Sequence, residues 1–272
     1  MNRPAGDGRY VLATGDLGAA RLQMLQDLYG ADSESLLAGL LTPDSLVADI
    51  GCGIGSVTHW LAGQLDRDGL AVGVDTSEAQ LAVAGSEFRH RGLPRPRFVA
   101  ADVYQLPFDT GSFDVVCCRS LLSHLANPPA AVGEMARLVR PGGVLVCEDI
   151  DMTTLYTDPP NRTYTAVNDL FFKLCQTYGA DYAVGSRLTE LMTDAGLGEP
   201  QQQTTQPAFR TGEAKRYWEY TFLETVPAML RAGVTTVTEV AALAAELEPL
   251  GTDDTTLVAA PAYTHAWARK PE

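Results

Sequence analysis

The sequence has no lysine- or arginine-rich run, and its 34 acidic and 20 basic residues give a net charge of -14. A field of this sign repels the phosphates of nucleic acids and anionic membrane surfaces, so we expect neither as a partner. No apolar stretch reaches about eighteen residues, and no basic segment followed by an apolar run stands near the first residue. These absences predict a cytoplasmic protein.

Cysteine is also scarce. The five cysteines are an odd number, and none of them forms a C-x-x-C pair. Such spacing favours neither a disulfide framework nor a metal site. We therefore expect the cysteines to be small apolar residues in a reducing compartment, and we expect no metal ligands.

Short apolar runs alternate with helical patterns through much of the chain. Strands are expected at residues 47–50, 71–75, 97–102, 113–118 and 144–147. Strands that alternate with helices imply right-handed crossovers and a parallel sheet, which binds ligands at the carboxyl ends of its strands. The sequence thus predicts an α/β fold.

Three glycines, Gly51, Gly53 and Gly55, follow the first expected strand and open a helix. Glycine tolerates positive φ and lets a ligand lie against the main chain, so such a turn can hold a nucleotide. The spacing is G-x-G-x-G after Asp49, whereas dinucleotide-binding folds have G-x-G-x-x-G. The pattern favours S-adenosylmethionine over NAD, although a purely structural turn can have the same composition.

Acidic residues end the next two expected strands as well. Asp75 lies about twenty residues after the glycines, where a carboxylate typically accepts hydrogen bonds from both ribose hydroxyls. Asp102 ends the third strand, where a merely solvated carboxylate is the alternative. Because the carboxyl ends of parallel strands meet at one edge, the repeated pattern indicates a ligand site there.

The rest of the chain is expected to complete one domain. Two short helices, at 19–28 and 35–41, precede the sheet, and the aromatic-rich helix 163–178 is either a packing helix or a lid over an apolar substrate. A helix at 213–230 should be interrupted by Pro227. The last two strands are expected at 201–209 and 256–268. The expected parts are a helical cap (1–45), a cofactor-binding core (46–150), a lid insertion (151–185) and the end of the sheet (186–272).

Together these motifs resemble the class I S-adenosylmethionine-dependent methyltransferases, in the branch of ubiquinone/menaquinone-biosynthesis-type and small-molecule enzymes. The matching segments are 47–55, 72–75, 101–102, 106–108, 112–116 and 138–143. The resemblance implies a Rossmann-like sheet of seven mostly parallel strands with a reversed last strand. It also implies methyl transfer to a small, apolar or aromatic metabolite, such as a secondary metabolite or a quinone-like acceptor.

The resemblance further implies roles for single residues. The three glycines would admit the cofactor backbone, Asp49 would bind its methionyl amine and Asp75 its ribose. Asp102 and Val103 would border the adenine, and Arg119 and Ser120 would lie near the methionyl end. The remaining candidates for the cofactor site are Tyr10, Gln26, Cys52, Thr76 and Gln80.

Members of this family that methylate adenine bases or planar amides usually carry an Asn/Asp-Pro-Pro-aromatic motif directly after the fourth strand. This chain has Arg119-Ser120-Leu121-Leu122 there, and its Asp158-Pro159-Pro160-Asn161 segment follows the fifth strand and lacks the aromatic residue. The departure argues for a small-molecule acceptor and against nucleic-acid adenine or protein glutamine.

His124 and Asp151 are the candidate general bases, because both follow strands at the expected ligand edge. For His124, the alternative is a side chain that fixes its loop or packs under the cofactor. For Asp151, the alternative is a neighbour of the cofactor. Two other functions stay open. A non-methylating S-adenosylmethionine-binding scaffold or cyclase would share every motif, and an NAD-dependent oxidoreductase would share the sheet and Asp75. A homodimer is compatible with all of them.

Overall fold

The computed structural model describes residues 16–88 and 96–272, which form two compact units. The sheet unit comprises Asp32–Asp151, Ala183–Thr205 and Tyr263–Glu272. The helical unit comprises Met152–Tyr182, Gln206–Ala262 and the described residues up to Ala31. Helix α1 (Asp16–Ala38) begins in the helical unit and ends in the sheet unit.

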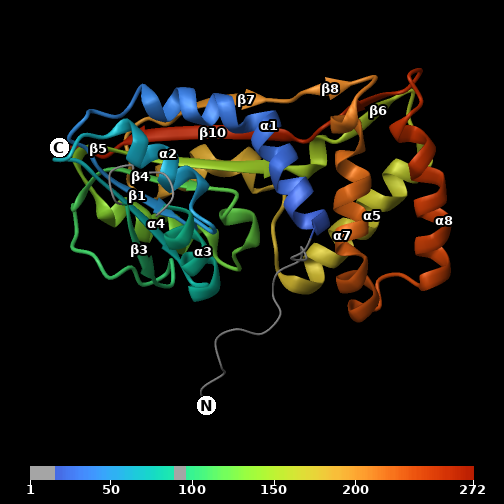
Figure 1. Ribbon diagram of the computed structural model, residues 1–272, viewed down its shortest axis with the longest axis horizontal. Coiled ribbons are helices and arrows are strands. Elements are labelled where there is room, and N and C mark those ends of the chain that lie inside the picture. The colour runs from blue at the N-terminus through green and yellow to red at the C-terminus, as the bar shows by residue number, and fades with distance from the viewer. Residues whose placement is uncertain (1–15, 89–95) are drawn as a thin grey trace, which may run out of the picture. The chain divides into compact units, whose positions relative to one another are not determined.

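Seven strands form one sheet in the order β3-β2-β1-β4-β5-β10-β7 (Figure 1). Strands β1 to β5 pair in parallel, and β10 runs antiparallel to β7. This confirms the mostly parallel, Rossmann-like sheet with a reversed last strand. The strands are β1 (Leu46–Ile50), β2 (Leu70–Asp75), β3 (Arg97–Ala100), β4 (Phe113–Arg119), β5 (Val139–Asp151), β7 (Gln201–Thr205) and β10 (Ala262–Arg269).

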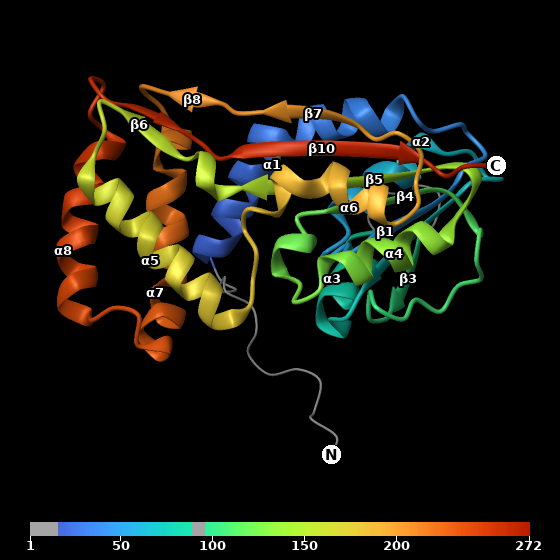
Figure 2. The same ribbon diagram turned by 180° about the vertical axis from the view of Figure 1, so that it is seen from behind.

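Helices cover both faces of this sheet, because its central strands are apolar on both sides. Successive residues of β1 illustrate the alternation: Val47 packs with Leu61 of α2 and Leu37 of α1, and Ala48 belongs to the core under α4 and α6. Figure 2 shows α4 and α6 in front of the strands. The helices are α2 (Ser56–Gln64), α3 (Glu78–Phe88), α4 (Pro128–Leu138) and α6 (Leu188–Asp194), with 3₁₀ turns η1 (Leu122–His124) and η3 (Val184–Arg187).

Three helices, α5, α7 and α8, lie side by side in the helical unit, beside a small antiparallel sheet of order β6-β9-β8 (Figures 1 and 2). The helices are α5 (Arg162–Tyr178), α7 (Tyr217–Ala232) and α8 (Val237–Leu247). The strands are β6 (Tyr156–Asp158), β8 (Ala208–Phe209) and β9 (Leu257–Ala259), and the 3₁₀ turns are η2 (Met152–Thr154), η4 (Glu213–Arg216) and η5 (Glu248–Gly251).

The prediction of two long terminal strands at 201–209 and 256–268 is wrong. Each of these segments forms two strands, and the two strands belong to different sheets. A proline stands at each division: Pro207 lies between β7 and β8, and Pro261 between β9 and β10. Proline has no N–H for a strand ladder, so a strand tends to end beside it.

Two helix predictions are also corrected. The two expected amino-terminal helices form one helix, α1, since the glycine between them at position 30 costs a helix only about 1 kcal/mol. Pro227 does not interrupt α7. Phe222 and Met229 on either side of it are fully buried, so packing holds the helix despite the missing N–H.

Candidate functional site

The carboxyl ends of the parallel strands lie level with one another. Ile50 of β1 lies beside Val74 of β2 and Cys118 of β4, and Arg119 of β4 lies beside Glu148 of β5. We refer to this end of the sheet as the carboxyl edge. Residues that end or follow these strands gather there, as the sequence pattern predicts.

The glycine turn is fixed to this edge by its main chain. Gly51, Gly53 and Gly55 have φ angles of 76°, 55° and 82°, a region that glycine enters without strain. The N–H groups of Gly51 and Cys52 donate to the carbonyl oxygen of Val74 at 2.7 and 2.9 Å. The turn therefore has one defined path from β1 into α2.

Two of the glycines are required by packing. A Cβ at Gly55 would lie 2.9 Å from the Cβ of Ala84 and 3.0 Å from the Phe98 ring. At Gly51 it would lie 2.8 Å from a methyl group of Leu121. Real Cβ atoms are almost never this close to a neighbour, so the sheet unit itself excludes side chains at both positions.

Gly53 differs from its neighbours. Within 4 Å its added Cβ would meet only Gln80 Oε1, the end of a flexible side chain, at 3.0 Å. Of the three glycines, Gly53 is therefore the one beside which a ligand has room. Cys52 is half-buried, and burial raises the pKa of its thiol well above the usual range, so the sulfur stays protonated.

Asp75 is held beside the turn by main-chain donors. Gly53 N–H donates to its Oδ2 and Ser77 N–H to its Oδ1, both at 2.9 Å. Each carboxylate oxygen keeps a lone pair for a further donor, and the side chain is partly exposed. This geometry suits a pair of ligand hydroxyls. Thr76 is exposed and Gln80 half-buried.

Asp49 is buried under the turn. Thr58 Oγ1 donates to its Oδ2 at 2.6 Å, and the side chain is 2% exposed. Burial raises the pKa of Asp49 to about 6, against the opposing effects of the Thr58 hydrogen bond and the positive charge of Arg119. A cation that reached this carboxylate would find little solvent screening.

Asp102 lies just after β3, and its carboxylate is exposed to solvent. Tyr104 N–H donates to its Oδ1 at 3.0 Å, so the carboxylate turns back over its own loop. Val103 is buried beneath it, 7% exposed. An apolar side chain and an acceptor therefore stand next to each other, as the edge of a purine requires.

The segment after β4 has an unusual backbone at Ser120. Its φ is 52°, its N–H donates to Glu148 O at 2.8 Å, and its hydroxyl lies 2.7 Å from Tyr263 Oη. Arg119, half-buried, precedes it at the end of the strand. Residues outside the usual φ/ψ regions concentrate at functional sites, so this segment stands out at the carboxyl edge.

His124 ends turn η1 and is half-buried. The turn is held by Asp149, a fully buried carboxylate that accepts from Ser123 N–H at 3.1 Å and from Ile150 N–H at 2.9 Å. Burial raises the pKa of Asp149 to about 6. The sequence interpretation missed Asp149, although its place at the end of an apolar strand was a usable signal.

Asp151 is the last residue of β5 and is 7% exposed. Asp151 therefore ends the first segment of the sheet unit, at the carboxyl end of β5. Two candidates lie elsewhere in the chain: Gln26 belongs to the helical unit, and Tyr10 lies outside the described residues.

A buried polar cluster that the sequence interpretation did not foresee joins three elements of the sheet unit. Glu148 accepts from Ser33 Oγ of α1 at 2.5 Å, and its other oxygen lies 2.6 Å from His265 Nδ1 of β10. Both Glu148 and His265 are 1% exposed. No local sequence signal could reveal the cluster, since more than a hundred residues separate its members.

The aromatic residues of the expected lid segment largely build the core of the helical unit. Phe171 makes edge-to-face contacts with Tyr182 and Trp218, at 4.9 and 5.3 Å between ring centroids, and Tyr164 lies 6.2 Å from Trp218. All four are at least 95% buried. Their enrichment is thus explained by packing, whereas Tyr156 is 48% exposed.

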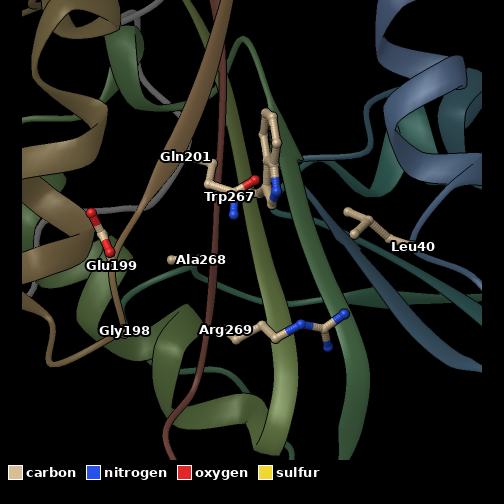
Figure 3. Close-up of a pocket in the computed structure, with 7 residues that line it drawn as sticks. All are labelled: Leu40, Gly198, Glu199, Gln201, Trp267, Ala268 and Arg269. Atoms are coloured by element: carbon tan, nitrogen blue, oxygen red, sulfur yellow. The ribbon is translucent and has the colours of Figure 1, made fainter.

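A groove of about 290 Å³ lies along β7 and β10 in the sheet unit. In Figure 3, Trp267 and Arg269 point toward the side on which Leu40 lies, and Glu199 points away. Arg269 donates to Gly142 O, near the start of β5. The groove is therefore at the opposite end of the sheet from the glycine turn.

Residues 48–147 match a family model described as a methyltransferase domain. The chain is 28% identical over 192 residues to the ubiquinone/menaquinone biosynthesis C-methyltransferase UbiE of Idiomarina loihiensis, covering 70% of this chain and 72% of that protein. It is 39% identical over 106 residues to the methyltransferase GfsG of Streptomyces halstedii, covering 38% and 37%. The chain spans about half the length, or less, of most curated relatives it matches.

Solved structures with the same fold include the YcgJ protein of Bacillus subtilis, at a TM-score of 0.59 and 18% identity over 89% of this chain and 99% of that one. The [4+2]-cyclase SpnF superposes at a TM-score of 0.53 and 17% identity over 96% and 98%. These comparisons support the resemblance inferred from the motifs: residues 48–147 match a methyltransferase domain, and the solved structures share the fold.

No helix in the described part of the chain is both long enough and apolar enough to cross a membrane. Residues 16–88 and 96–272 also contain no group of three or more His, Cys, Asp or Glu side chains placed to hold a metal ion.

Proposed function

We propose that this protein binds S-adenosylmethionine at the carboxyl edge and transfers its methyl group to a small molecule. The observation that carries the proposal is the placement of Asp75, whose carboxylate is fixed by Gly53 and Ser77 beside the open side of the glycine turn. When bound, the cofactor supplies a sulfonium-activated methyl group. The protein needs chiefly to orient the acceptor and exclude water.

The residues of the carboxyl edge fit the parts of this cofactor. Gly53 admits its backbone, with Gly51, Cys52 and Gly55 shaping the turn, and Asp49 offers a buried anion to its ammonium group. Asp75 takes the ribose, with Thr76 and Gln80 at the start of the next helix. Asp102 and Val103 border the adenine, and Arg119 and Ser120 lie toward the methionyl end. Tyr10 and Gln26 complete the proposed set as covers.

His124 is the proposed general base, and Asp151 the second candidate. A positioned base adds roughly 10²- to 10⁴-fold in rate when the acceptor must lose a proton. Support comes from the anchoring of η1 by Asp149, which fixes the turn that ends at His124. The acceptor is a small, apolar or aromatic metabolite, such as a secondary metabolite or a quinone-like molecule. A quinone-like acceptor agrees with the similarity to the ubiquinone/menaquinone biosynthesis C-methyltransferase UbiE.

The finer expectations about partners belong to the same proposal. The net charge of -14 supports the exclusion of nucleic acid, and five free cysteines, four of them buried, suit a reducing cytoplasm. A homodimer is proposed as the assembly, to be tested by sedimentation.

Calorimetry with S-adenosylmethionine tests the cofactor site. Wild type should bind, and Asp75→Ala should weaken binding at least tenfold, because two hydroxyl hydrogen bonds to a carboxylate are lost. Equal affinity of the two proteins contradicts the placement. Incubation with host extract then tests the reaction: a methylated product with release of S-adenosylhomocysteine supports transfer, whereas product without that release supports a cyclase.

A further inference from the structure

Ser120 is the only non-glycine residue with positive φ within residues 16–88 and 96–272. In this region the Cβ crowds the backbone carbonyl, so a residue other than glycine remains there only when its surroundings hold it. The neighbouring Leu121 packs against Gly51, the first glycine of the turn. The conformation of Ser120 therefore sets where the segment after β4 meets the glycine turn.

Two groups hold Ser120 in place. Its N–H donates to Glu148 O at 2.8 Å, and its Oγ lies 2.7 Å from Tyr263 Oη. Tyr263 Oη in turn donates to Glu148 O at 3.4 Å, so the Ser120 hydroxyl can donate to the tyrosine while the tyrosine donates to the carbonyl. Tyr263 is 1% exposed, and burial raises the pKa of its phenol above the usual range.

Glu148 provides a rigid base for this arrangement. Its carboxylate is held on one oxygen by Ser33 and on the other by His265. The rings of Tyr263 and His265 also contact each other, at 5.3 Å between centroids, on one face of β10. The side chain of Tyr263 thus connects β10 with Ser120, which follows β4 on the other side of β5.

We propose that Tyr263 is a positioning residue for the cofactor: its hydroxyl keeps Ser120 in the left-handed conformation that seats Leu121 on the glycine turn. The inference rests on the proposed function, since it requires the cofactor to bind at the carboxyl edge. It assigns to the last strand of the sheet a role in shaping the site.

Calorimetry with S-adenosylhomocysteine tests this role in Tyr263→Phe, Ser120→Ala, their double variant and Ser120→Gly. Tyr263→Phe and Ser120→Ala should each weaken binding about threefold to tenfold, the effect of one buried hydrogen bond, and the double variant should bind no more weakly than the weaker single variant. Ser120→Gly should bind more tightly than Ser120→Ala, because glycine adopts positive φ unaided. Tyr164→Phe, which removes a buried hydroxyl in the helical unit, is the control and should bind as wild type.

Additive losses in the double variant, or unchanged affinity in Tyr263→Phe, overturn the proposal. So does equal weakening by Ser120→Gly and Ser120→Ala, which assigns the serine hydroxyl to direct contact. If Tyr263→Phe does not fold, this glycine-alanine comparison alone decides. Asp75→Ala distinguishes a failure of the proposed cofactor site from a failure of the role of Tyr263. If Asp75→Ala binds like wild type, the proposed cofactor site is wrong. If Asp75→Ala weakens binding and Tyr263→Phe does not, only the role of Tyr263 is wrong.

Discussion

Burial changes the chemistry of single acidic residues at the carboxyl edge. Asp49 and Asp149 are both buried, and burial raises the pKa of each to about 6. The folded state therefore binds these protons more tightly than the unfolded chain, where the ordinary value is 3.8. Stability from each group is complete below about pH 4 and is lost as the pH rises through about 6.

The first prediction concerns Asp49→Asn. The asparagine keeps an acceptor for Thr58 but carries no charge, so its burial does not become more costly as the pH rises. The free energy of unfolding of the variant, relative to that of wild type, should therefore increase by about 1 to 3 kcal/mol as the pH rises from 5 to 8. Urea unfolding of both proteins across this range measures the difference, in which the contribution of Asp149 cancels. A difference that does not change with pH contradicts the assigned burial effect.

At the scale of elements, the glycine turn combines a packing requirement with a binding requirement. Gly55 faces Ala84 and Phe98, whereas Gly53 faces only the flexible end of Gln80. The sequence pattern predicts the turn and its position but treats the three glycines alike. Their separate reasons depend on α3 and β3, which pack against the turn only in the folded sheet unit.

Alanine at the two positions should separate these requirements. Gly55→Ala should lose about 2 to 4 kcal/mol of stability, from overpacking added to the strain of positive φ. Gly53→Ala should lose only about 1 kcal/mol, the strain alone, but should weaken S-adenosylhomocysteine binding at least tenfold. Urea unfolding and calorimetry provide the two measurements. Equal stability losses would show that packing does not distinguish the glycines.

The whole molecule carries a strong excess of negative charge, with 34 acidic and 20 basic residues. Self-repulsion of this kind destabilises a compact state, and salt screens it. We predict that the melting temperature at pH 8 rises by a few degrees between about 0.01 and 0.2 M NaCl. The rise should nearly vanish near the sequence pI of about 4.6, where the net charge is small. A fall in melting temperature at pH 8 contradicts the prediction.

The sequence by itself determined the features that depend on neighbouring residues: the alternation of strands and helices, the glycine turn after β1, and the acids at the strand ends. These follow from local pattern, because strand burial, turn geometry and strand direction are all expressed within a few tens of residues. Only the tertiary structure decided how Ser120 and Tyr263 meet at the carbonyl oxygen of Glu148, and how Ser33 and His265 hold the Glu148 carboxylate. These residues lie on α1, β5, β10 and the segment after β4, and hydrogen bonds across such sequence distances exist only once the sheet has brought β4, β5 and β10 together.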